Sequence, residues 1–144
     1  MAIEDQVIAR LKASVPALRT VEGAMSLAAL MQTNALPQAE VGGHVITLGL
    51  QGAQADAAAG AYTQIITETI GVVITWRSYS QTGGRDQASV GALIRAVMDA
   101  LVGWSPNDEI GSFEFRRGAP TTVTKGTIVY LLEFSITDQL RILT

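Results

Sequence analysis

The amino-acid sequence predicts an α+β domain in which two main helices pack on one face of a mostly antiparallel, four- to five-stranded sheet. Three segments support this prediction. Residues 3–14 repeat apolar side chains at helical spacing, Tyr62–Arg77 alternates like a long strand, and an amphipathic helix follows at Asp86–Gly103. The 144 residues are enough for one domain with its own core and too few for two, so we assign 1–144 to a single domain.

The N-terminal part is predicted to fold as helix, strand and helix. The first helix begins at Ile3, carries acids in its first turn where the helix dipole favours them, and ends near Ser14 because of Pro16. Leu18–Gly23 is short and ends in glycine, which indicates a brief strand. A short helix capped by a serine is expected over residues 26–31.

Two strands and a protrusion are predicted in the middle of the chain. His44–Leu50 has strand character, and Gln51–Ala61 lacks any large apolar residue, so we expect it to be a protruding hairpin loop. Tyr62–Arg77 is the strongest strand, with isoleucine and valine on one parity and threonine on the other. Glu68 falls on the apolar parity. Either it sits near a solvated strand end, or the sheet face around it meets another chain.

The C-terminal half is predicted to be one helix and two strands. Asp86 caps the helix over 86–103, which Gly103 ends. Phe113–Arg117 alternates as a short strand, and Thr127–Ile136 is apolar on both faces, which favours a central or interface position. The remaining residues, 137–144, form an apolar tail.

Composition excludes several classes of function. The net charge is −3, which argues against a protein that binds nucleic acid through a basic surface. Cysteine is absent, so there is no disulfide framework, thiolate metal site or cysteine nucleophile. No apolar run is long enough to cross a membrane, and the N-terminus carries acids where a signal peptide carries positive charge. We therefore expect a soluble intracellular domain.

No set of residues has the pattern of an active site. His44 is the single histidine, without partners for a metal, and a capped or solvated ring is expected. Gly83-Gly84 lacks a phosphate-binding fingerprint and is interpreted as a turn before a helix cap. Glu114 and Glu133 would need to be adjacent to act as an acid–base pair, and Arg116-Arg117 is typical of surface or interface salt bridges. We predict no catalytic residue, no metal and no cofactor.

A small-ligand binder or enzyme is the rival class of function. It requires convergent polar groups in an apolar cavity between sheet and helices. Tyr62, Trp76, Tyr79 and Trp104 are the candidate walls of such a pocket. Aromatic residues at the ends of strands and helices more often anchor cores or interfaces, which favours the structural interpretation.

The charges are unevenly distributed along the chain. Residues 1–72 carry six acids and three bases, whereas 73–144 carry seven of each. Thr20–Trp76 contains no lysine or arginine, and its four acids are Glu22, Glu40, Asp56 and Glu68. Such a stretch is typical of a surface that must not retain DNA, although chance in a chain rich in alanine and glycine produces the same bias.

In its elements and size, the chain resembles the phage tail terminator (tail completion) family of long non-contractile tails. The resemblance rests on the opening helix over 3–12 followed by Leu18–Gly23, on the strand Tyr62–Arg77, on the helix Asp86–Gly103 and on the closing strand Val129–Ile136. It covers nearly the whole chain, and none of these segments is chemically diagnostic.

The resemblance implies a structural virion protein rather than an enzyme. It implies a hexameric ring that caps the tail tube, ends tube polymerisation and joins the tail to the head–neck connector. The expected partners are other copies of the chain, the tail tube protein and a neck or connector protein. DNA would pass through without specific binding, and no membrane is involved. The location implied is the head-proximal end of the virion tail, after synthesis in the host cytoplasm. Another neck component of the same particle is the alternative.

Two groups of residues follow as candidate sites. The apolar surplus of the last strand and tail predicts subunit contacts, with Tyr62, Leu140, Ile142 and Leu143 as the candidate interface residues. A cationic channel wall would bind phosphates and hinder the movement of DNA. The acids at positions 22, 40, 56 and 68 are therefore candidates for the channel-facing surface.

Overall fold

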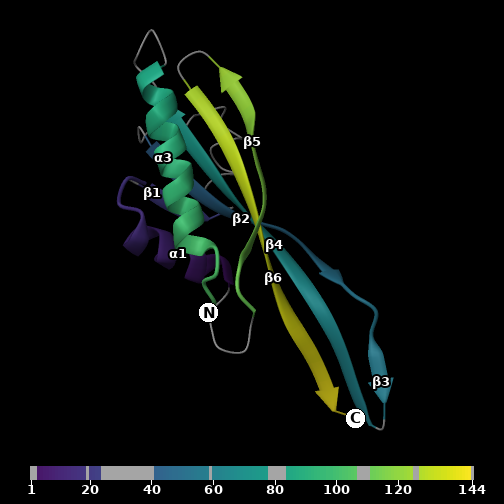
Figure 1. Cartoon of the computed structure of the whole chain (residues 1–144). Helices are drawn as coiled ribbons and strands as arrows, with labels where there is room; N and C mark the ends of the chain where they lie inside the picture. Colours follow the sequence, from purple (N-terminus) through teal and green to yellow (C-terminus); the bar gives the residue numbers. More distant parts are fainter. Residues whose placement is uncertain are drawn as a thin grey trace.

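The computed structural model describes residues 3–18, 20–23, 41–58, 60–77, 84–106, 111–124 and 127–143. Two helices cover one side of a mostly antiparallel sheet (Figure 1), as predicted for the α+β class. In chain order, the elements are α1 (Ile3–Ser14), β1 (Thr20–Gly23), β2 (Val41–Gly52), β3 (Asp56–Ala58), β4 (Ala61–Arg77), α3 (Gly84–Leu101), β5 (Glu114–Thr124) and β6 (Thr127–Leu143).

The sheet has the strand order β1-β2-β4-β6-β5, and the short β3 pairs with β4. β1 runs parallel to β2, and the other pairings are antiparallel. β2 and β3 lie one after the other along the same edge of β4, since Gly52 pairs with Ile66 and Asp56 with Thr63. β4 is therefore the central strand, with β2 and β3 along one edge and β6 along the other.

The core lies where the helices cover the sheet. Val7 and Leu11 of α1 and Leu93 and Val97 of α3 are buried against the sheet. The remaining core residues are Val15, Leu18, Val21, Val41, Val45, Ile70, Val72, Ile74, Ala100, Leu101, Phe113, Leu132, Phe134 and Ile136. A branched and aromatic interior of this kind supplies the main driving force for folding.

The sheet continues well beyond this core. β4 and β6 are paired from Arg77 and Thr127 in the body to Ala61 and Leu143 at the far end. Figure 1 shows their distal parts, together with β3, extending away from both helices. Within β4 and β6, no described side chain beyond Ile70 and Ile136 is buried. We call this extension, residues 48–58, 60–69 and 137–143, the arm.

The arm corrects two predictions. The tail after Ile136 is not separate from the last strand, because β6 continues to Leu143. The segment 51–61 does protrude as a hairpin, but most of its described residues are paired, in the end of β2 and in β3. The short unpaired stretch at its centre is held by the Ala53 N–H, which donates to Ile65 O at 2.9 Å, and by Gln64 Nε2, which donates to Ala53 O at 2.8 Å. Backbone pairing with β4 thus orders a sequence that lacks large apolar side chains.

Several element boundaries also differ from prediction. The helix predicted to begin at Asp86 starts at Gly84, so Asp86 lies in its first turn. The helix ends at Leu101, and Gly103 follows with a φ of +79°, the left-handed conformation expected of a glycine after a helix. β5 is longer than predicted and contains Pro120, which an edge strand tolerates because one side needs no hydrogen bond. The helix predicted over 26–31 and the turn before residue 84 lie outside the described residues.

Candidate interaction surfaces

The predicted channel-facing acids do not gather on one described surface. Glu22 lies on β1 in the body, and Asp56 lies on β3 near the tip of the arm. Glu68 lies on β4 at the base of the arm. Asp56 is in register with Thr63, whereas Glu68 has the parity of Ile70 on the opposite face of the sheet. Glu40 lies outside the described residues, so the lumen assignment stays a prediction.

Glu68 marks the transition from body to arm. It is partly buried, and its register partners are Leu50 on β2 and Ile136 on β6. Burial raises the pKa of the Glu68 carboxyl above its ordinary value. A carboxylate at the edge of an apolar sheet face is a suitable position for contact with a basic partner surface.

The four predicted interface residues do lie together. Ile142 pairs with Tyr62 and Leu143 with Ala61, while Leu140 pairs with Gln64, so all four predicted positions are at the distal end of the arm. Tyr62, Leu140 and Ile142 share one face of the sheet, and Leu143 has the parity of the other face. The Tyr62 hydroxyl donates to Gln64 Oε1 at 3.1 Å, and Leu140 is 38% exposed. Their clustering makes the arm a candidate contact surface.

His44 is buried, and the prediction of a capped or solvated ring is wrong. β2 lies between β1 and β4, and only 1% of the surface of His44 is exposed. Neither ring nitrogen has a hydrogen-bond partner, and Nε2 lies 3.6 Å from Oε2 of Glu22 on the neighbouring strand. Burial lowers the pKa of His44, with a smaller opposing effect from Glu22. The neutral imidazole is therefore the favoured form.

The carboxylates considered as an acid–base pair are each engaged by arginine. Arg117 Nε lies 3.1 Å from Glu133 Oε2, and an Arg116 guanidinium nitrogen lies 3.5 Å from Glu114 Oε2. Arg116 Nε also donates to Ser135 Oγ at 2.6 Å. These contacts confirm that the arginine pair forms surface salt bridges.

The aromatic side chains considered as pocket walls do not surround one cavity. Tyr62 lies in the arm, and Tyr79 lies outside the described residues. Trp104 stacks on Phe113 with ring centroids 5.9 Å apart, and the Arg10 guanidinium lies 5.2 Å from the Trp104 ring. Arg10 Nε also donates to Ala100 O at 3.0 Å, which ties α1 to the end of α3. This aromatic group stabilises the helix packing.

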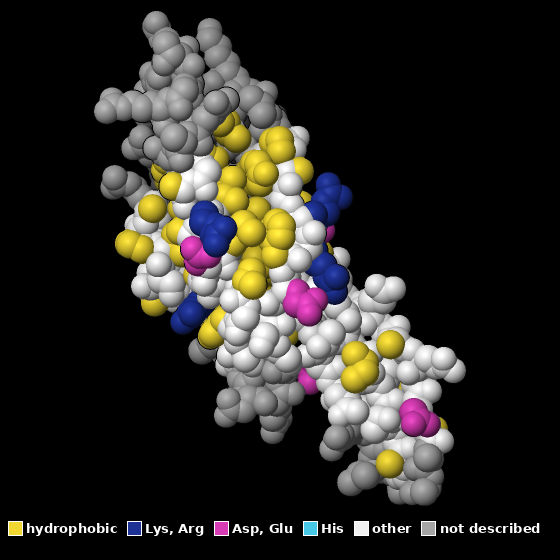
Figure 2. All heavy atoms as spheres, viewed as in Figure 1, with side chains coloured by type: hydrophobic (Ala, Val, Ile, Leu, Met, Phe, Trp, Pro, Cys, Tyr) yellow, Lys and Arg dark blue, Asp and Glu magenta, His cyan; other side chains and the backbone are white. Residues whose placement is uncertain are grey.

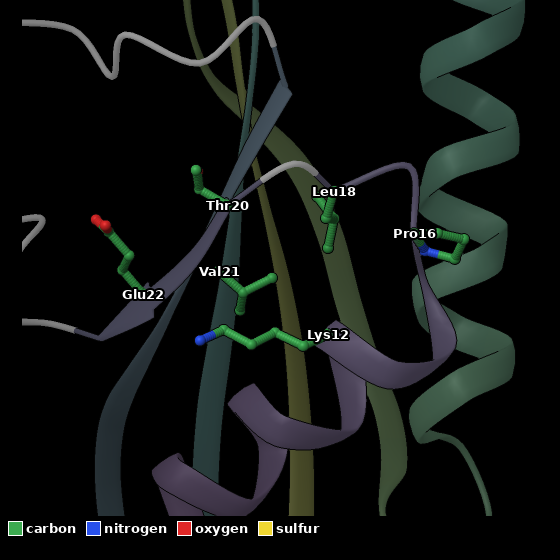
Figure 3. A pocket seen from close by; sticks show the side chains of 6 residues that line it. All are labelled: Lys12, Pro16, Leu18, Thr20, Val21 and Glu22. Carbon is green, nitrogen blue, oxygen red and sulfur yellow. The ribbon is translucent and has the colours of Figure 1, made fainter.

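A wide groove does lie between the end of α1 and β1 (Figure 3). Its volume is about 590 Å³, and its walls are Lys12, Pro16, Leu18, Thr20, Val21 and Glu22. The side chain of Lys12 extends from α1 past Val21 of β1. The groove is open to solvent and has few polar groups converging on one point, unlike the enclosed apolar sites that bind small molecules.

Features of a metal site or a membrane helix are lacking in the described ranges. No three of their histidine, aspartate and glutamate side chains are close enough together to hold a metal ion. The described helices also fall short of the length and apolarity needed to cross a bilayer.

Sequence reasoning missed a second apolar surface, on the body. Phe115 is 37% exposed on β5, and it contacts Phe134 edge-on with centroids 5.7 Å apart. Figure 2 shows hydrophobic side chains gathered on this side of the molecule, with basic side chains flanking them. The alternation around Phe115 was the available signal, but the strand was predicted to end at Arg117.

Comparison with known proteins gives one family and one fold. The model of the phage tail terminator protein family matches residues 2–143. A chain in the virion of a native gene transfer agent particle has a similar fold, with a TM-score of 0.56 and 20% sequence identity over 96% of both chains. Curated protein sequences contain no match to this chain.

Proposed function

The chain belongs to the phage tail terminator protein family, and on this premise we propose that it assembles into a closed ring, six-fold by family resemblance, which caps the tail tube. In this role the ring ends tube polymerisation and presents its other side to the head–neck connector. The family is structural and non-enzymatic, which confirms the prediction that the chain is not an enzyme and places it in the virion tail.

The observation that supports assembly most strongly is the arm. A sheet normally buries its apolar face against other elements, and here β4 and β6 continue past both helices. Leu50 is 70% exposed and Leu140 38% exposed on the same face of this extension. A neighbouring subunit in a ring would cover such a surface, whereas a monomer leaves it in water.

DNA passage sets a second condition on the ring. The acids at positions 22, 40, 56 and 68 occupy a stretch of sequence without lysine or arginine, which favours a channel wall that does not hold phosphates. Screening limits electrostatic repulsion to roughly 8–10 Å at physiological salt, so only residues that line a narrow channel contribute. We propose that at least one of these acids faces the lumen.

Solution mass and tube capping test the proposal. Mass photometry of the purified chain, alone and with tail tubes, should show a discrete six-fold oligomer, and the chain should stop the elongation of growing tubes at substoichiometric amounts. A chain that stays monomeric at high concentration and does not bind tube ends would refute the proposal. Binding to connector rings without binding to tubes would assign the chain to the neck instead.

A further inference from the structure

One face of the arm continues the core face of the sheet without the helices that cover it in the body. The strand register places alternate side chains on this face, because paired residues in a sheet point to the same side. The residues at these positions are Leu50, Gly52, Tyr62, Gln64, Ile66, Glu68, Asp138, Leu140 and Ile142, and we call them the arm apolar face. Leu50 and Leu140 are the most exposed of its described large apolar side chains.

The opposite face of the arm is polar. It carries Thr63, Thr67, Thr69 and Thr137. Its exposed apolar residues include Ile65, at 44%, and Leu48 at the base of the arm, at 42%, whose side chain lies near Gly71 on this face. Hydroxyl groups interact well with water, so this face does not require a protein partner. The two faces therefore differ enough for one to serve as the control for the other.

The arm apolar face also has a defined charge. Glu68 and Asp138 are its charged residues, and Arg141, the arm's one basic residue, is in register with Thr63 on the polar face. Asp138 is exposed, and its Oδ1 accepts a hydrogen bond from the Gln139 N–H at 2.8 Å. A surface that covers this face would gain from being apolar with a basic border.

The body presents a surface of that kind around Gly118 on β5. A Cβ atom at Gly118 would lie 2.7 Å from Leu132 Cδ2, 3.3 Å from Tyr130 Cε1 and 3.5 Å from Phe115 Cζ, so three apolar side chains converge over this glycine. Phe115 is partly exposed, as is Tyr130. We call Phe115, Gly118 and Tyr130 the β5 patch.

Basic side chains border this side of the body. Arg95 of α3 is 75% exposed, and Arg116 and Arg117 on the edge strand β5 are 53% and 70% exposed. Arg116 and Arg117 contact Ser135 and Glu133, which lie on the face of β6 opposite to Leu132 and Phe134, so both arginines extend from the sheet edge toward the face opposite the β5 patch. In Figure 2, basic side chains stand on both sides of the central hydrophobic area. Arg95 pairs with Asp99 on the surface of α3, Arg117 pairs with the partly buried Glu133, and Arg116 contacts Glu114 and the Ser135 hydroxyl. An exposed pair such as Arg95–Asp99 contributes little to stability, so exchanging Asp99 for a partner's acid costs little.

We propose that the arm apolar face of one copy packs on the β5 patch of the next copy, with Glu68 and Asp138 near the basic side chains at the margins of this side of the body. The inference rests on the proposed ring and identifies the contact between its neighbouring subunits. The two surfaces are different parts of the chain, so the contact is head-to-tail, and each copy gives one arm and receives another. Contacts of this type close into rings when the rotation between copies allows it.

Cross-linking tests the contact directly, because the chain has no cysteine of its own. A Leu140→Cys copy is mixed with a Phe115→Cys copy and treated with a short bis-maleimide. The control mixture replaces the first copy with Ile65→Cys, which has similar exposure but lies on the polar face of the arm. We expect a covalent heterodimer in the first mixture, in at least tenfold excess over the control.

The wild-type mass, measured in parallel, separates failure of the contact from failure of the ring. If the wild type is oligomeric and the two mixtures cross-link equally or not at all, the arm–patch contact is refuted and the ring stands. If the wild type is monomeric and nothing cross-links, both are refuted. If the first mixture alone cross-links while the wild type forms open chains, the contact stands and the closed ring fails.

A complementation experiment gives a second measurement without cross-linking. Leu140→Asp damages the arm and leaves the patch intact, and Phe115→Asp does the reverse. Both positions are exposed, so circular dichroism should show folded proteins. Each variant alone should be monomeric, and their mixture should stop at a heterodimer, because one good arm and one good patch remain. Larger oligomers from either variant alone would overturn the proposal.

Discussion

Leu132 and Leu140 offer a direct test of how the helices divide the sheet into body and arm. Both lie on β6, and both are on the face that the helices cover in the body. Leu132 pairs with Val72 in the core and is 1% exposed, whereas Leu140 pairs with Gln64 in the arm and is 38% exposed. Replacing each by alanine removes the same atoms from two environments, which differ chiefly in whether the helices pack over the side chain.

The expected costs follow from burial. Removing a fully buried leucine side chain loses its transfer free energy and leaves a cavity, so Leu132→Ala should lower the free energy of unfolding by about 3 kcal/mol. Leu140 is only partly buried and has no helix above it, so Leu140→Ala should cost about 1 kcal/mol. For a chain of this length, the melting temperature should fall by roughly 6–12 °C and 2–4 °C respectively.

Urea unfolding at low protein concentration provides the assay. Trp76 at the end of β4 and Trp104 after α3 are the chain's two tryptophans, and both report on the body. The dependence of the unfolding free energy on urea should be the same for both variants, since each unfolds the same surface. Equal costs for Leu132→Ala and Leu140→Ala would show that the arm is covered within the monomer, and the reasoning would fail.

Protein concentration extends the test to the assembled state. Association that buries Leu140 adds its stabilisation only where copies meet, so the cost of Leu140→Ala should rise with concentration. The cost of Leu132→Ala should not change, because its surroundings belong to one copy. A concentration effect of the same size in both variants would contradict the assignment of the arm as the contact surface.

Three further predictions concern single positions. Burial lowers the folded-state pKa of His44, so near and below about pH 6.5 the unfolded chain binds more protons than the folded chain. Urea titrations should therefore show that the free energy of unfolding falls as the pH is lowered, and His44→Gln should remove this part of the pH dependence. Gly103→Ala should lower the free energy of unfolding by about 1 kcal/mol, because the φ of Gly103 is +79°. Gly91→Ala should raise it by about 0.5–1 kcal/mol in the same denaturation assay, because Gly91 lies within α3 and an added Cβ meets no atom there. Gly118→Ala should cost about 1–3 kcal/mol, because its Cβ would displace a buried leucine, and thermal melts that match the wild type would show that the close packing there is absent.

The sequence determined the elements whose signal is local. The alternation in Tyr62–Arg77 fixed a strand and its buried face, and Ile70, Val72 and Ile74 are indeed in the core. The apolar spacing after Asp86 fixed the second helix, and Gly103 marked its end. Such patterns depend on the geometry of one segment, so neighbouring residues carry enough information to define them. The distal cluster of Tyr62 with the C-terminal residues was predicted as an interface group, and the register brings these positions together.

Tertiary pairing decided what local pattern could not. Residues 51–58 and 137–143 have little strand signal, and they are extended because β4 lies between them and satisfies their backbone groups. Glu22 lies beside His44 because β1 pairs in parallel with β2, a contact between segments that are distant in sequence. The β5 patch exists only where β5 and β6 bring Phe115 and Tyr130 over Gly118. Burial depends on which segments become neighbours in space, and that property belongs to the whole chain rather than to any window of it.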